Sequence, residues 1–230
     1  MRRISDLITM TRDKYPCDDF FDRVGKTLRS SGEARAFYRA YDSALDCLDP
    51  DSWEVLSGKA VSHFQDHREG QLKQGFFNQL NEAFGYQYLV RRGFSGVSMV
   101  PEGKSKTPDL VYYSGSERRH CEVKTVCLSE DEIARRSCEN QYVNRSMYGE
   151  LSLGFLKKLK DDLSRASVQI TSSQSAGLIF VFAQFDDFTQ TYYDRYREQI
   201  SECLADHLAP EVCVKVGLIG GRRIQKPLRT

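Results

Sequence analysis

Two acidic residues and a lysine lie close to one another in the middle of the chain, on segments that we predict to be strands. Asp109 directly precedes the β-rich run 110–113, and Glu122 and Lys124 lie in the run 120–128. Carboxylates that are grouped with a lysine can bind a metal ion and activate water. The chemistry depends on whether the two segments pair.

The connection between the two segments predicts that they form a hairpin. It contains Gly115-Ser116, and a two-residue turn at these positions or a four-residue loop over 114–117 gives the same antiparallel register. In that register Asp109 faces Glu122. Opposed side chains have Cβ atoms about 4.5–5.5 Å apart, so two carboxylates would repel each other unless a cation lay between them.

Residue alternation along the second segment assigns a polar face and an apolar face to the hairpin. Lys124 follows Glu122 by two residues and therefore points to the same face. The opposite face carries residues typical of a core, namely Leu110, Tyr112, Cys121 and Val123. We expect Asp109, Glu122 and Lys124 to share the polar face.

This set of groups is suited to the hydrolysis of a phosphodiester bond. Asp109 and Glu122 would hold Mg²⁺, which acidifies a bound water and neutralises developing charge, while Lys124 would orient or polarise that water. Carboxylate oxygens favour Mg²⁺ or Mn²⁺ over zinc, and we expect Mn²⁺ to substitute for Mg²⁺. The alternative is an exposed hairpin on which the three side chains form a salt-bridge cluster.

The elements around these residues occur in an order typical of one group of nucleases. Pro108 stands directly before Asp109, and Glu122-Val123-Lys124 has the form Glu-x-Lys. A helix with an acidic residue precedes them, and a basic amphipathic helix and an apolar strand follow. Over about residues 70–185 the chain resembles the PD-(D/E)xK nuclease superfamily. The resemblance implies an α/β fold with a restriction-endonuclease-like core, a mixed central sheet flanked by helices.

The resemblance also implies roles for individual residues. Asp109 and Glu122 would be the metal-binding acids and Lys124 the catalytic lysine. The backbone carbonyl of Val123 would be an additional metal ligand. Water would attack in line with the leaving 3′ oxygen, and cleavage would leave a 5′ phosphate.

Two further positions match the family less directly. Glu82 resembles the acidic residue of the family's first helix, and Glu69 competes with it for this role. Gln169, in the later helix, stands where many members place a polar residue that faces the site; the alternative is a half-exposed glutamine.

Substrate contacts would have to come from local groups. Lys104 and Lys106 precede Asp109, and Tyr142 and Arg145 combine an aromatic face with donors in the polar stretch 129–150, as expected of a loop that grips a nucleic-acid strand. Solvated surface is the alternative for each of them.

Three histidines are weaker candidates. His63 and His67 are four residues apart on a predicted helix, where a solvated face is the simpler interpretation. His120 falls on the polar face of the predicted hairpin, where it could contact a phosphate or transfer a proton, but we interpret it as edge-strand surface.

The hydrophobic pattern predicts a helical N-terminal extension over 1–68, and the resemblance implies a nuclease domain over 69–230 that ends with an additional helix and strand. Asp49-Pro50 ends one helix and caps the next. The remaining elements are expected as helices over 20–28, 34–48, 53–92, 156–170 and 192–208, with a break near 69–70, and as strands over 97–100, 176–185 and 212–219, before a basic tail.

Composition excludes several classes of protein. The chain has 230 residues, and its 33 Lys and Arg against 32 Asp and Glu exclude a strongly basic nucleic-acid-binding protein. The seven cysteines include no Cys-x-x-Cys pair and fit reduced thiols in the cytoplasm. We find no export signal and no apolar run long enough to span a membrane, so we expect no membrane partner.

Together these features predict a cytoplasmic, Mg²⁺-dependent nuclease that hydrolyses phosphodiester bonds, with a DNA endonuclease favoured over an RNA-directed enzyme. A homodimer would supply two sites for a double-strand break. One alternative is a module of the same fold that binds nucleic acid or protein without hydrolysis. Another is a nuclease for RNA or for branched or damaged DNA.

Overall fold

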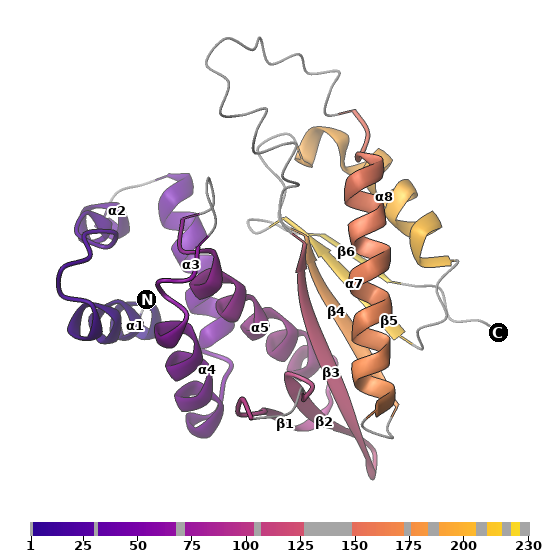
Figure 1. The fold of residues 1–230 in the computed structure, drawn as a ribbon, viewed down its shortest axis with the longest axis horizontal. Coiled ribbons are helices and arrows are strands. Elements are labelled where there is room, and N and C mark those ends of the chain that lie inside the picture. The colour runs from indigo at the N-terminus through magenta and orange to yellow at the C-terminus, as the bar shows by residue number, and fades with distance from the viewer. Residues whose placement is uncertain are drawn as a thin grey trace. The chain divides into compact units, whose positions relative to one another are not determined.

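The computed structural model describes residues 2–29, 32–67, 72–103, 107–126, 149–172, 176–183, 189–205, 211–217 and 222–225. The fold is mixed α/β, with a six-stranded mixed sheet in the order β1-β2-β3-β4-β5-β6 that is flanked by helices (Figure 1). The chain forms two compact units, Met1–Arg118 and Arg119–Thr230, which we call unit 1 and unit 2. The boundary between these units does not test the domain division expected after residue 68, which stays a prediction.

Unit 1 contains five helices among its described residues, followed by two strands. The helices are α1 (Arg2–Lys14), α2 (Val24–Arg29), α3 (Glu33–Leu45), α4 (Pro50–Ser62) and α5 (Gln74–Arg91). The expected start of α4 is confirmed: the Asp49 side chain accepts a hydrogen bond of 2.8 Å from the Ser52 amide, and Pro50 occupies the first turn.

Helix α5 is the centre of unit 1. Helices α3 and α4 and strands β1 (Ser95–Met99) and β2 (Leu110–Ser114) all pack against it. Most of the helix is buried, including every residue from Leu80 to Leu89. A helix that is buried on all sides needs partners for its polar side chains, and Asn81 accepts a hydrogen bond of 2.9 Å from the hydroxyl of Tyr41.

The second strand of unit 1 ends at a tight turn. Strand β2 stops at Ser114 and β3 begins at Glu117, which leaves the two-residue turn that was one of the two expected connections. Gly115, the first residue of the turn, has a φ of 64°, a left-handed conformation that glycine adopts without steric cost.

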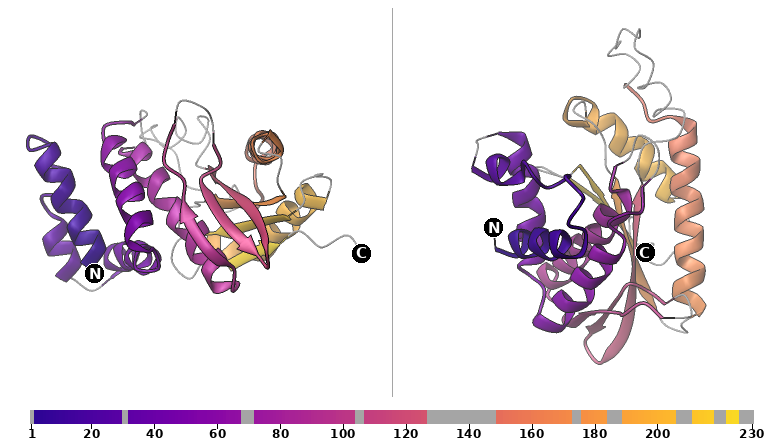
Figure 2. Two further views of the ribbon diagram at one scale, coloured as in Figure 1. Left: turned by 90° about the horizontal axis from the view of Figure 1, so that it is seen from below. Right: turned by 60° about the vertical axis from the view of Figure 1, so that its left-hand side comes forward.

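Unit 2 is built on parallel strands. Strand β3 (Glu117–Val126) pairs in parallel with β4 (Gly177–Ala183), and β4 pairs in parallel with β5 (Glu211–Val216). Helices α7 (Leu153–Ser172) and α8 (Thr189–Ala205) cover one face, and their apolar residues pack on alternate residues of these strands (Figures 1 and 2). All seven residues of β4 are buried, as its continuous apolar sequence predicts.

Two elements were not expected from the sequence. Helix α1 begins at Arg2, within the extension that was expected to be helical but at a place where no individual helix was predicted. Strand β6 (Arg222–Gln225) pairs antiparallel with β5, so our prediction of a tail directly after the turn was wrong at these residues. The burial of Ile224 accounts for this strand. When the four residues pair with β5, the Ile224 side chain enters the core under α7 and α8.

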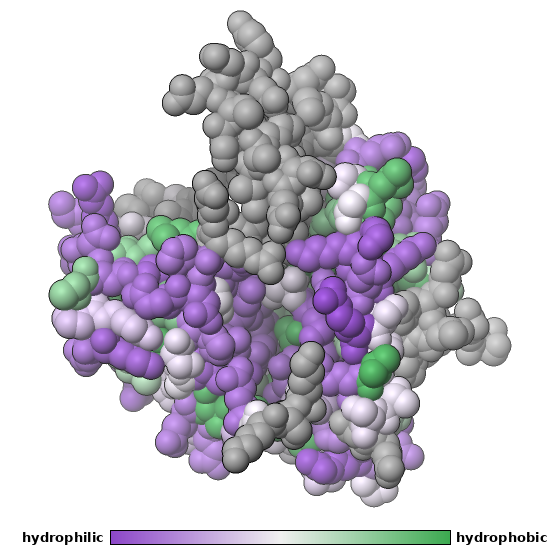
Figure 3. Space-filling model, viewed as in Figure 1, coloured by the Kyte–Doolittle hydropathy of each residue, from purple (hydrophilic) through white to green (hydrophobic). Residues whose placement is uncertain are grey.

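No helix among the described residues is long and apolar enough to cross a membrane. The face drawn in Figure 3 is mostly hydrophilic, with isolated apolar side chains. Large exposed apolar residues include Leu153 and Val168, both on α7, and Leu72.

Candidate functional site

The Glu-x-Lys residues lie in the buried middle of β3. Glu122 is 1% exposed, whereas the Lys124 side chain is 26% exposed. The Lys124 ammonium forms an ion pair with Oε1 of Glu122. The predicted grouping of these two side chains on one face of the strand is therefore confirmed.

That face is covered by a core in unit 2, whereas residue alternation had assigned the core to the opposite face. Glu122 is in register with Ile179 and Lys124 with Val181, and both of these β4 residues belong to the core under α7 and α8. Side chains in register on parallel strands point to the same face. The sequence could not show this covering, because α7 and α8 follow β3 by more than twenty residues.

Three other residues that we considered lie near this part of unit 2. Val123 is 8% exposed and is in register with Phe180 on the opposite face. Gln169 is half-buried in α7. His120 is buried as well, and our interpretation of it as edge-strand surface was wrong, because β4 pairs alongside β3 at this point.

The other two predicted acids belong to unit 1. Asp109 is half-buried and directly precedes β2, where its carbonyl accepts a hydrogen bond of 2.9 Å from the Val100 amide. Glu82 is 6% exposed in the middle of α5. The predicted opposition of Asp109 and Glu122 joins residues of different units and stays a prediction.

A lysine that sequence analysis did not single out neutralises Glu82. Lys59, in α4, donates hydrogen bonds of 2.8 Å to both carboxylate oxygens of Glu82, and its side chain is 9% exposed. A second carboxylate, that of Glu102, lies 3.9 Å from the same ammonium. We call Lys59, Glu82, Glu102 and His63 the Lys59 cluster.

The charge of Lys59 is stabilised by several acids. Burial alone would lower the pKa of Lys59, but the negative charge of Glu82 and its hydrogen bonds, and the charges of Asp109 and Glu102, raise that pKa above its usual value. Asp109 is thus within electrostatic range of the same ammonium that holds Glu82.

A signal for Lys59 was present in the sequence. Lys59 lies between Leu56 and Ala60 on the apolar stripe of α4 and is therefore directed inward with them. A lysine on a buried stripe needs a carboxylate partner, and this requirement points to an acid on a neighbouring helix.

His63 extends the cluster toward solvent. Its Nε2 lies 3.5 Å from Glu102, and its Nδ1 lies 2.6 Å from Asp66. Helix α4 ends at Ser62, so our prediction of His63 and His67 as a pair on one helix was wrong. His67 instead makes a 2.9 Å hydrogen bond to the carbonyl of Gln65.

The remaining expected positions lie outside the described residues. They are the four suggested substrate contacts Lys104, Lys106, Tyr142 and Arg145, and the alternative acid Glu69. Their roles stay predictions.

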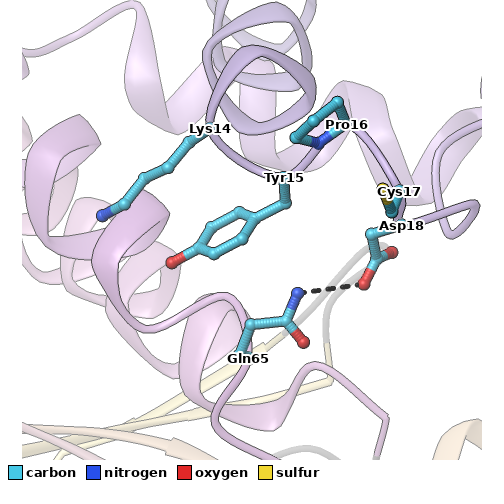
Figure 4. A pocket seen from close by; sticks show the side chains of 6 residues that line it. All are labelled: Lys14, Tyr15, Pro16, Cys17, Asp18 and Gln65. Carbon is cyan, nitrogen blue, oxygen red and sulfur yellow. Dashed lines mark hydrogen bonds between the residues drawn. The ribbon is translucent and has the colours of Figure 1, made fainter.

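A pocket of about 360 Å³ lies elsewhere in unit 1 (Figure 4). Its lining consists of Lys14, Tyr15, Pro16, Cys17, Asp18 and Gln65. Asp18 is already occupied, since it accepts a 3.1 Å hydrogen bond from Gln65 and pairs with Lys73. None of the predicted catalytic residues lines this pocket. The candidate site is therefore defined by its acidic and basic side chains and not by this pocket.

Asp109 and Glu122, the metal ligands predicted from the sequence, each offer carboxylate oxygens of the kind that a hard cation prefers. In the described part of the chain no group of three or more His, Cys, Asp or Glu side chains is arranged to hold a metal ion. In comparisons with known proteins, no family model, no curated protein and no solved structure matches the chain.

Proposed function

We propose that this chain is a metal-dependent nuclease that hydrolyses phosphodiester bonds in nucleic acid, with DNA as the favoured substrate and a restriction-endonuclease-like core. One observation carries the proposal: Pro108-Asp109 directly precedes β2, and Glu122-Val123-Lys124 lies within β3, just beyond a two-residue turn. This arrangement has the form of the PD-(D/E)xK motif. The helix before it, α5, carries a buried glutamate, Glu82, which resembles the acidic residue of the family's first helix.

Asp109 and Glu122 would hold Mg²⁺, with Mn²⁺ as a substitute, and the Val123 carbonyl would be a further ligand. When bound, the metal would supply an acidified water and neutralise charge that develops on the phosphate. Lys124 is the most exposed of these β3 side chains and would orient the attacking water. Its ion pair keeps the Glu122 carboxylate next to the ammonium.

Gln169 supports the same assignment from the later helix. Helix α7 covers the face of the sheet to which Glu122 points. Ile170, the next residue, lies close to Gly177, which is in register with His120. This end of α7 therefore lies near the start of β3, and we propose that Gln169 contacts substrate from there.

The test is cleavage by purified wild type and Lys124→Ala. Supercoiled, linear and single-stranded DNA and RNA are each incubated with Mg²⁺, Mn²⁺ or a chelator. We expect metal-dependent cleavage by the wild type and a loss of about 100-fold or more in Lys124→Ala, because the group that positions water is removed.

Lys157→Ala is the matched control. Lys157 is an exposed lysine of α7 that pairs with Asp161, one turn along the helix. Its loss should leave cleavage unchanged. Equal cleavage by wild type, Lys124→Ala and Asp109→Ala, or cleavage that resists the chelator, would refute the nuclease.

A second candidate function is a non-hydrolytic module that binds nucleic acid or protein. It is favoured by the finding that Glu82 and Glu122 are each paired with a lysine, as in purely structural ion pairs. Calorimetry separates the two functions. A nuclease should take up Mg²⁺ or Mn²⁺ through Asp109 and lose this uptake in Asp109→Ala, whereas the module needs no metal.

A further inference from the structure

Lys59 is tied to the proposed nuclease site although it belongs to the helical N-terminal region. Its ammonium contacts both oxygens of Glu82 at 2.8 Å, with both side chains less than one-tenth exposed. A two-oxygen contact in a buried setting restricts the rotation of the carboxylate. The position of Glu82 is therefore set by a residue of α4.

Two links hold α4 where Lys59 can do this. Helix α4 packs along α5, the helix that carries Glu82. The Ser52 hydroxyl of α4 also accepts a hydrogen bond of 3.0 Å from the amide of Met99, at the end of β1. Strand β1 pairs in turn with β2, at whose start Asp109 lies.

The same ammonium interacts electrostatically with Asp109. A lysine and a divalent metal ion are both cations, so a metal held by Asp109 would be repelled by Lys59. Lys59 would thus act in two ways: it orients Glu82, and it weakens the binding of a cation at Asp109.

We propose that Lys59 is a positioning residue of the nuclease site, which fixes Glu82 and sets the metal affinity through its charge. The inference rests on the proposed function. If Lys59 has this role, α4 contributes to the nuclease site although it belongs to the helical N-terminal extension.

The experiment is a calorimetric titration of the full chain with Mn²⁺ alone, near pH 8, together with cleavage rates at saturating Mn²⁺. In Lys59→Met we expect the dissociation constant for Mn²⁺ to fall about tenfold, because one repelling charge is removed. The cleavage rate should fall, because Glu82 loses its orienting partner. A loss of structure alone would weaken metal binding, so this pair of opposite changes is specific to the proposal.

Two variants show whether charge is the cause. Lys59→Arg keeps the charge, and its Mn²⁺ affinity should remain near that of the wild type. Lys73→Met is the matched control: Lys73 is a buried lysine of unit 1 that pairs with Asp18 and lies over the Phe64 ring. Its loss should not tighten Mn²⁺ binding.

Because Lys59→Met leaves the buried Glu82 carboxylate without this lysine and can unfold the protein, the comparison is repeated with Glu82→Gln. Adding Lys59→Met to Glu82→Gln should again tighten Mn²⁺ binding but should cause no further loss of cleavage, since Lys59 acts on the reaction through Glu82.

Each result decides a different claim. Unchanged or weaker Mn²⁺ binding on loss of Lys59, in folded protein, overturns the role of Lys59 and leaves the nuclease standing. No Mn²⁺ uptake by the wild type overturns the proposed function, and the role of Lys59 with it.

Discussion

Lys215 is a buried lysine near the end of β5. It is 6% exposed, its ammonium donates to the carbonyl of Gly217, and it lies 5.1 Å from the centre of the Phe182 ring. Burial, and next the nearby charge of Arg223, lower the pKa of Lys215 to about 8. Folding therefore has to bury a charge at neutral pH, and this cost is present below about pH 8.

The sign of the pH dependence follows from that pKa. Between pH 8 and 10.5 the unfolded chain holds a proton on Lys215 that the folded chain has released, so stability rises with pH over this window. Comparison with Lys215→Met removes the contribution of all other titrating groups. Relative to that variant, the free energy of unfolding of the wild type should rise by up to about 3 kcal/mol from pH 7 to pH 10.5. Urea unfolding at both pH values measures it, and a pH-independent difference would contradict the shift.

Residue types alone were enough to select Glu122 and Lys124 as a pair, because alternation along a strand puts residues two apart on one face. They did not predict that Glu122 is buried, since burial depends on α7 and α8, which lie far along the chain. The inward position of Lys59 on α4 could be predicted from the sequence, but its partner could not, because Glu82 lies on the next helix, α5, and a single sequence does not show which residues of two helices meet.

At the scale of elements, the start of β4 depends on close packing against β3. A Cβ on Gly177 would lie 2.3 Å from the His120 carbonyl oxygen and 2.8 Å from Cγ2 of Ile170. Backbone atoms of a paired strand cannot yield as a flexible side chain can. The two strands and the end of α7 therefore require glycine at this position.

Gly177→Ala should lower the free energy of unfolding by about 1–3 kcal/mol or more, the usual cost of overpacking. Gly58→Ala is the matched control, because Gly58 is an exposed residue of α4 with no atom within 4 Å of an added Cβ. That change should raise stability by about 0.5–1 kcal/mol, since alanine favours a helix. Thermal or urea unfolding measures both, and equal effects would refute the packing argument.

Elements with strong local signals were predicted well. Asp49-Pro50 marked the start of α4 through its capping chemistry, and the unbroken apolar sequence of β4 marked a strand covered on both faces. Strand β6 was missed because four residues rich in arginine carry no strand signal by themselves; their pairing with β5 forms the strand. Helix α1 lies in the extension expected to be helical, but its bounds were not predicted although Ile4, Leu7, Ile8 and Thr11 form a buried stripe at helical spacing.

At the scale of the whole molecule, near-neutral charge limits how nucleic acid can be bound. The chain carries 33 basic and 32 acidic side chains, so its affinity cannot come from a broad positive surface. If local clusters supply the phosphate contacts, few counterions are released on binding. The dependence of affinity on salt should then be shallow.

We expect log K against log salt to have a slope no steeper than about −4, which corresponds to about four phosphate contacts. Fluorescence anisotropy of a labelled DNA duplex with Lys124→Ala, which is expected to bind without cleaving, measures it. A slope near −8 would show that the protein neutralises many phosphates and that its charge is far more concentrated than the composition indicates.

Helix α5 also has a consequence for how this protein can change over evolutionary time. Because α3, α4, β1 and β2 all pack on it, from Leu80 to Leu89 it offers no surface at which substitutions are free. The exposed side of α7 carries no comparable constraint. In proteins descended from this chain, the sequence should therefore change fastest along that side of α7 and slowest in α5. Sequence similarity between distant descendants should then persist longest in α5.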